Sequence, residues 1–144
     1  MTSSEDPYNL QRFVEAQNPK IDKVKKELRA GHKQTHWMWY VFPQVAGLGS
    51  SRMAKRYAIS SREEAEAYLA HPVLGPRLRE CTEIVNGIEG RSANEIFGSP
   101  DDLKFRSSMT LFCEVADDPE PFRTALESYY DESDPKTLQF LEGS

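Results

Sequence analysis

A small polar residue followed directly by proline occurs five times in this chain and divides it into segments of helical length. The pairs are Asp6-Pro7, Asn18-Pro19, Ser99-Pro100, Asp118-Pro119 and Asp134-Pro135. In each pair the polar side chain can accept a hydrogen bond from a free N–H group at a helix start. Proline suits the first helical position because it has no N–H to leave unpaired. The pattern predicts that a helix begins at each of these pairs.

Apolar residues recur three or four positions apart between these signals, which is the spacing of one helix face. The stretches are 10–14, 21–28, 65–69, 74–88, 105–116, 122–129 and 138–141. Two capping boxes, Ser61 with Glu64 and Ser92 with Glu95, add further helix starts, and Gly31 is placed to end the helix of 21–28. The apolar stripe of 105–116 is broad, so this helix should be central. We expect an all-α, compact single-domain bundle of about seven or eight short-to-medium helices.

The chain of 144 residues has the size of one ordinary domain. Neither a linker nor an internal repeat stands out, so we expect residues 1–144 to form a single domain, with residues 1–6 as a flexible N-terminal tail. The helix-poor stretches, 31–35 and 43–50, have ordinary loop lengths. Cys81 and Cys113 both fall at apolar positions of helical patterns, which favours two buried free thiols and a reducing compartment.

The charge balance disfavours several classes of partner. The formal net charge is −5, which opposes general affinity for nucleic acid or anionic membranes. The start of the chain lacks the basic and apolar regions of a signal peptide, and no apolar run approaches the ~20 residues needed to span a bilayer. We expect a cytoplasmic protein without membrane association. One local basic pocket remains compatible with this charge.

The segment His36-Trp37-Met38-Trp39-Tyr40-Val41-Phe42-Pro43-Gln44 is the compositional outlier, because it holds both tryptophans of the chain. Consecutive bulky side chains cannot all face one way. At least one aromatic must therefore face a second surface. One interpretation is a helix buried on two sides and ended by Pro43, and the other is that Trp37 or Trp39 lines a pocket.

A glycine- and serine-rich turn follows this segment and leads into a basic stretch. The turn contains Gly47, Gly49, Ser50 and Arg52, followed by Lys55 and Arg56. Backbone N–H groups in such a turn, with these cations, can bind an anion. It matches neither the phosphate-binding P-loop nor the dinucleotide fingerprint, and a solvated turn with an ordinary basic face is the alternative.

A third polar cluster precedes the most apolar part of 105–116. It includes Lys104, Ser107 and Ser108, which on a central helix would be partly enclosed and need partners. A lysine-assisted serine is one interpretation, and simple surface exposure is the other. His32 and His36 have helical metal-ligand spacing, but no third ligand is evident. We expect no metal and no cofactor.

Several of these segments also occur in a known family. They include Leu10-Gln11-Arg12-Phe13, His36-Trp37-Met38-Trp39 with Phe42-Pro43-Gln44, Gly47-Leu48-Gly49-Ser50, Tyr68-Leu69-Ala70-His71-Pro72, Glu95-Ile96-Phe97-Gly98, Asp101-Asp102-Leu103-Lys104 and Ser107-Ser108-Met109-Thr110-Leu111-Phe112. Through them the chain resembles the domain-of-unknown-function family 1810, especially its mycobacterial and related actinobacterial members. The resemblance implies a helical fold and no established activity. Some members carry a calpastatin-like label, but such inhibitors are long disordered chains, whereas this composition is that of a compact domain.

The hypothesis we favour is a pocket for an anionic, nucleotide-like small molecule. Its ligand-binding residues would be Trp37, Trp39, Gln44, Gly47, Gly49, Ser50, Arg52, Arg91, Lys104, Ser107 and Ser108. If the chain is an enzyme, which the sequence leaves open, His36 is the candidate acid or base because its ordinary pKa lies near neutrality. The alternative is a protein–protein interaction module with no catalytic activity and a partner the sequence does not identify.

Overall fold

The computed structural model describes residues 6–143, and this part of the chain contains ten α-helices and no β-strand. The helices are α1 (Gln11–Gln17), α2 (Ile21–Arg29), α3 (Met38–Val41), α4 (Arg52–Arg56), α5 (Arg62–Ala70), α6 (Leu74–Asn86), α7 (Ala93–Phe97), α8 (Asp101–Val115), α9 (Phe122–Tyr129) and α10 (Pro135–Glu142). The prediction of a helical fold is confirmed, but seven or eight helices is too few. The additional ones, α3 and α4, have only 4 and 5 residues, which is too short to produce a recognisable apolar stripe.

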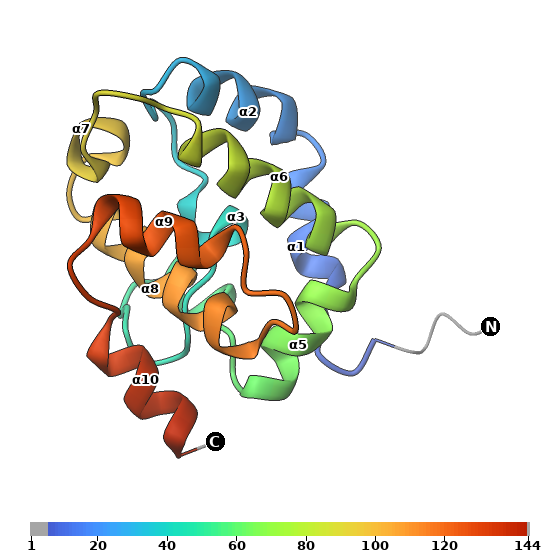
Figure 1. Cartoon of the computed structure of the whole chain (residues 1–144). Helices are drawn as coiled ribbons and strands as arrows, with labels where there is room; N and C mark the ends of the chain where they lie inside the picture. The colour runs from blue at the N-terminus through green and yellow to red at the C-terminus, as the bar shows by residue number, and fades with distance from the viewer. Residues whose placement is uncertain (1–5, 144) are drawn as a thin grey trace.

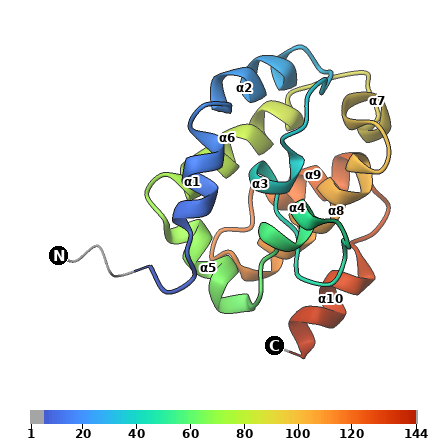
Figure 2. The ribbon, with the colours of Figure 1, turned by 180° about the vertical axis from the view of Figure 1, so that it is seen from behind.

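Helix α8 lies at the centre of the molecule, as the sequence predicts. It packs against α5, α7, α9 and α10, and Figure 1 shows it enclosed among them. Its Phe105, Met109 and Phe112 are fully buried, and each such side chain contributes roughly 1.5–3 kcal/mol on leaving water. Helix α6 packs against α2, α5 and α9, and Figures 1 and 2 both show α2 and α6 side by side.

Two helix ends form as their sequences predict. Ser92 and Glu95 make a complete capping box at the start of α7. At the end of α2, Gly31 has a φ of +73°, a conformation that favours glycine. The N–H of Gly31 donates to the carbonyl of Leu28, and the N–H of His32 donates to that of Glu27, so the last carbonyls of α2 are paired in a Schellman motif.

The second predicted capping box forms only in part. The Ser61 hydroxyl accepts a hydrogen bond from the Glu64 N–H and caps α5. The Glu64 carboxylate does not return to Ser61. It accepts from Ser60 and from Arg12 on α1, so it links two segments that are distant in sequence.

In four of the proline pairs the proline lies one to four residues before the first residue of the helix that follows. Only Asp134-Pro135 has the predicted placement, with Asp134 at the N-cap and Pro135 in the first turn of α10, but the Asp134 side chain makes no cap hydrogen bond. At the other four pairs the proline lies in the turn before the helix or at its N-cap. The tail predicted for residues 1–6 lies almost wholly outside the described residues. Of these six, Asp6 is described, and its carboxylate accepts hydrogen bonds from the N–H groups of Leu10 and Gln11.

The two cysteines differ in burial. Both thiols are free, as predicted, but Cys81 is buried whereas Cys113 is only half-buried. The expectation of two buried thiols is therefore corrected at Cys113, which lies near the C-terminal end of α8. None of the helices within residues 6–143 has the length and apolar character to cross a membrane.

Candidate functional site

The two tryptophans of the aromatic segment face in opposite directions. α3 is a single turn, and residues two positions apart on a helix lie about 200° apart around its axis. Trp37, the N-cap of α3, is 1% exposed, whereas Trp39 is half-buried and lines a cavity. The segment thus serves both as core and as the wall of a hollow, which combines the two interpretations of its sequence.

Glu27 on α2 fixes the buried tryptophan. Its carboxylate accepts hydrogen bonds from the indole N–H of Trp37 at 2.9 Å, from the N–H groups of Gln34 and Thr35, and from the Thr35 hydroxyl at 2.6 Å. Burial alone would raise the pKa of Glu27, but these bonds to its charged form lower it to about 2. Trp37 is therefore anchored inside, and Trp39 is directed outward.

The chain after α3 forms a loop whose ends are paired. Val45 and Ile59 make an isolated parallel bridge: the Ala46 N–H donates to the Ile59 carbonyl at 2.9 Å, and the Ile59 N–H donates to the Gln44 carbonyl at 2.8 Å. The residues between, which include α4, form one wall of the hollow. We call residues 44–59 the site loop.

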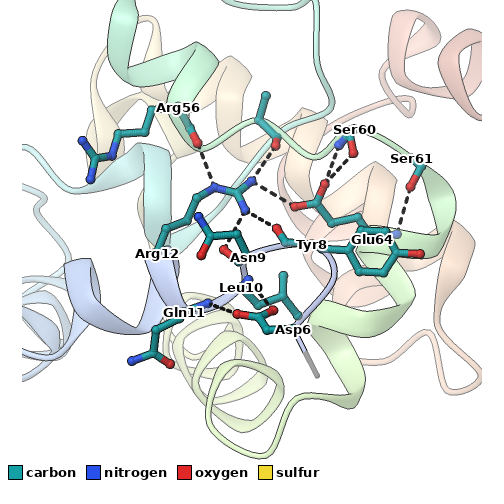
Figure 3. A network of polar contacts seen from close by, with 11 residues as sticks. Asp6, Tyr8, Asn9, Leu10, Gln11, Arg12, Arg56, Ser60, Ser61 and Glu64 are labelled. Carbon is teal, nitrogen blue, oxygen red and sulfur yellow. Dashed lines mark hydrogen bonds and ion pairs between the residues drawn. The ribbon is translucent and has the colours of Figure 1, made fainter. Parts of the chain in front are cut away.

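Arg12 on α1 holds the far end of the site loop, as Figure 3 shows. Its guanidinium donates to the carbonyls of Arg56 at 2.8 Å and Ala58 at 3.0 Å and to the Glu64 carboxylate at 2.9 Å. It also donates to the carbonyls of Tyr8 and Asn9. Because Glu64 is buried, this pairing is shielded from water and binds α1, the site loop and α5 together.

The hollow consists of two neighbouring pockets. The inner pocket, of about 140 Å³, lies between α3 and the site loop, and the outer pocket, of about 500 Å³, lies between the site loop, α8 and α10. The two parts share Gln44, Gly49, Ala54 and Lys104. The inner pocket is the more enclosed, and its walls include the buried Met38, Phe42 and Val45.

Two glycines shape the wall for different reasons. Gly47 has a φ of +95°, a conformation that other residues rarely adopt. At Gly49 a Cβ atom would lie 2.6 Å from the Cβ of Ala54, so this position has no room for a side chain. The turn can therefore pass close over α4 only because both residues are glycine.

Lys104 enters the hollow from α8 and is held over Trp39. Its Nζ lies 5.5 Å from the centre of the Trp39 ring and 3.6 Å from Oδ1 of Asp101. The other oxygen of Asp101 lies 2.7 Å from Nζ of Lys33, which in turn lies 5.2 Å from the Trp37 ring. Asp101 thereby joins two lysines, each placed over one tryptophan at a cation–π distance.

A polar cluster forms the far side of the outer pocket. The Ser107 hydroxyl donates to Oδ2 of Asp134 at 2.9 Å, the Thr137 hydroxyl donates to the same oxygen at 2.6 Å, and Arg106 lies 3.6 Å from Oδ1. Burial alone would raise the pKa of Asp134, but these partners lower it. Asp134 is thus an internally paired carboxylate. Lys104, which is itself paired with Asp101, and Lys136 also face the outer pocket.

The structure brings together seven of the eleven predicted binding residues. Those lining the hollow are Trp39, Gln44, Gly47, Gly49, Ser50, Lys104 and Ser107. The other four do not line it: Trp37 is sealed in the core and Ser108 is fully buried, Arg52 is exposed on α4, and Arg91 lies against Gly31. His36, the candidate acid or base, is also exposed and does not line the hollow.

The sequence did not identify several charged residues of the hollow as site residues. Lys55 and Arg106 stand within the basic and polar stretches noted above, but Asp134 and Lys136 come from the start of α10, 30 and 32 positions after Lys104. Asp134 was recognised only as a helix cap. Among residues 6–143, no group of three His, Cys, Asp or Glu side chains is placed to hold a metal ion.

The comparisons with known proteins agree with this fold. A family model described as "Protein of unknown function (DUF1810)" matches residues 7–141. The chain belongs to this family. The crystal structure of the conserved hypothetical protein Rv1873 from Mycobacterium tuberculosis superposes with a TM-score of 0.94 and is 56% identical, covering 95% of this chain and 99% of its own. A search of curated proteins finds no match.

These findings confirm the resemblance stated from sequence, including the similarity to mycobacterial members. Neither the family description nor the name of the mycobacterial protein states an activity. The hollow is therefore the feature of the molecule that indicates a function.

Proposed function

We propose that this family member binds a small anionic molecule in the hollow between α3, the site loop, α8 and α10. The supporting observation is the local charge. The lining includes the cations Lys55, Lys104, Arg106 and Lys136, and Asp134 is its single carboxylate, although the chain as a whole carries −5. Cations gathered in a concave site concentrate anions there.

Trp39 adds an apolar wall beside these charges. Binding pockets combine apolar surface with a few convergent polar groups, and the hollow offers the Trp39 ring, the Gln44 amide and the Lys104 ammonium together. Arg52 is exposed on α4 and does not line the hollow. The lysines therefore replace Arg52 as the proposed charged partners of the anion.

Tryptophan fluorescence tests this proposal. Nucleoside monophosphates and sugar phosphates are titrated into two variants, Trp37→Phe, which leaves Trp39 as the reporter, and Trp39→Phe, which leaves Trp37. A saturable change is expected in the first variant and a much smaller one in the second. Lys104→Met should weaken the response, while Lys23→Met, on the exposed face of α2, serves as the matched control. Absence of any saturable response across the panel would end the proposal.

The alternative function, a protein–protein interaction module, has less support from the exposed surface. Within residues 6–143, Leu103 is the one large apolar side chain that is exposed, at 53%, and a single exposed leucine is ordinary for a protein surface. The aromatic segment forms no exposed patch, since Trp37 is sealed and Trp39 lies in a concave wall.

A further inference from the structure

The two parts of the hollow differ in chemistry as well as in size. The inner pocket is walled largely by aromatic and aliphatic side chains, including Trp39, Phe42 and Tyr57, although Lys55 and Lys104 also line it. The outer pocket presents three cations, Lys104, Arg106 and Lys136, together with Asp134 and hydroxyl groups. The aromatic walls therefore favour a planar ring in the inner pocket, and the cations favour an anionic group in the outer pocket.

The volume of the inner pocket limits the apolar end. At about 140 Å³ it is close to the ~150 Å³ apolar cavity that accepts one benzene molecule. A second fused ring would need space that the buried walls at Phe42 and Val45 do not offer without repacking. Trp39 supplies a ring surface, and aromatic pairs favour stacked or edge-to-face contacts.

The junction between the two parts contains a polar side chain without an internal partner. The Gln44 amide lines both pockets, and no hydrogen bond joins it to another side chain or backbone group in the part of the chain that the structure describes. An amide offers both a donor and an acceptor. It is placed to pair with a polar atom where the ring joins the rest of a ligand.

We infer that the ligand carries one six-membered planar ring, which enters the inner pocket against Trp39, joined to a phosphate or carboxylate that stays in the outer pocket beside Lys104 and Lys136. This inference rests on the proposed function and narrows it. A pyrimidine nucleotide and a simple aryl phosphate share this chemistry. A purine nucleotide and a sugar phosphate do not, because one has too large a ring system and the other has none.

Calorimetric titration of the full chain with four compounds tests the inference. Phenyl phosphate and uridine monophosphate each carry one six-membered ring, adenosine monophosphate carries two fused rings, and ribose 5-phosphate carries no planar ring. Tighter binding by about tenfold is expected for at least one of the single-ring compounds over the last two. Equal or tighter binding of adenosine monophosphate or ribose 5-phosphate would overturn the inference and leave the proposed function standing. No binding by any of the four would instead count against the proposed function itself.

Two kinds of variant distinguish the contribution of the inner pocket to ligand binding from that of the outer pocket. Ala46→Leu and Ala58→Leu each fill the inner pocket alone, from opposite ends of the site loop, whereas Lys136→Glu changes the outer pocket alone. We expect the alanine variants to weaken the single-ring compounds by about tenfold or more and to leave ribose 5-phosphate unchanged. Lys136→Glu should weaken all bound anions by about fivefold, while Lys23→Glu, with the same change in net charge, should not.

Thermal melting establishes that each variant is folded before titration. Because the two alanines lie at different ends of the site loop, loss of fold in one leaves the other as the test. Unchanged affinity for the single-ring compounds in a folded alanine variant would show that the ring does not enter the inner pocket and would overturn the inference.

Discussion

The Glu27 carboxylate accepts hydrogen bonds from four donors in the segment before α3 while being only 7% exposed. A buried charge is costly unless such bonds replace water. Here the donors are two backbone N–H groups, the Thr35 hydroxyl and the Trp37 indole. Through one side chain, the direction of the loop and the burial of Trp37 are fixed together.

Replacing Glu27 by Gln should lower the free energy of unfolding by about 2–3 kcal/mol at pH 7, because the amide loses the charge that these donors face. The folded pKa of about 2 lies below the ordinary value of 4.5. Stability from this group is therefore complete above pH ~4.5 and is lost as the pH falls toward 2. Urea denaturation at pH 7 and pH 3 should show the difference between wild type and variant shrinking at the lower pH. A difference that stays constant would contradict the assigned pKa.

The absence of a side chain at Gly49 can be tested together with Ala54, the residue that such a side chain would contact. A Cβ at this position would lie 2.6 Å from the Cβ of Ala54, so Gly49→Ala should cost about 1–3 kcal/mol of stability through overpacking. Ala54→Gly alone should cost about 1 kcal/mol, as glycine does within a helix. The double variant should be more stable than the sum of the two losses predicts, because the clash is absent. Strict additivity in denaturation experiments would show that the loop moves away instead.

Arg12 connects three elements that a smaller cation could not reach at once. From α1, its planar guanidinium donates along several directions to the segment before α1, the end of α4 and α5, and it lies 4.4 Å from the Phe13 ring centre. Lysine has the same charge but a single ammonium group, so it cannot make these bonds together. The position of the site loop therefore depends on the shape of the arginine as well as on its charge.

Arg12→Lys should destabilise the protein by about 2–3 kcal/mol and loosen the site loop in particular. The expected local effect is faster hydrogen exchange at the N–H of Ile59, which donates to the Gln44 carbonyl. Arg52→Lys, at an exposed position on α4, is the matched control and should change stability by less than about 0.5 kcal/mol. If the two substitutions have equal effects on exchange at Ile59, the network does not hold the loop.

The long helices could be predicted from sequence because each carries its own apolar stripe, as α8 shows. The short helix α7 could be predicted because the Ser92–Glu95 capping box marks its start. The short helices α3 and α4 could not, since their position follows from contacts made elsewhere. The composition of the aromatic segment required that some ring face a second surface. Glu27 binds Trp37, ten residues later, and so decides that Trp39 is the ring that faces the second surface. No local pattern reveals this.

In the hollow, too, local sequence patterns predict some of the residues, whereas contacts between distant segments place the others. Gln44, Gly47 and Gly49 are near one another in sequence, so their grouping could be anticipated. Lys136 reaches the outer pocket because Asp134 binds α10 to Ser107 on α8, a long-range contact that sequence spacing does not encode. Arg91 was expected beside the hollow, but it lies against Gly31, because the chain before α7 runs along the end of α2.

The reactivity of the Cys81 thiol can show whether the core around α6 and the contacts of Glu27 unfold together as one cooperative unit. It is fully buried on α6, and burial raises its pKa to about 12. Since the thiolate is the reacting form, alkylation at pH 8 should require opening of the core. Cys113 is half-buried and should react first. In a Cys113→Ser background, the remaining thiol should therefore report unfolding of the core around α6.

If that core opens as one cooperative unit, loss of the Glu27 contacts between α2 and the aromatic segment should accelerate labelling of Cys81 on α6. Adding Glu27→Gln to Cys113→Ser should raise the labelling rate by about tenfold for each 1.4 kcal/mol lost in denaturation, because the open population rises in that proportion. Cys113→Ser alone is the reference, and labelling in urea gives the rate of the unfolded thiol. A rate unaffected by Glu27→Gln would mean that α6 opens locally, without release of the Glu27 contacts, and that the loop carrying the tryptophans is a separate unit of stability.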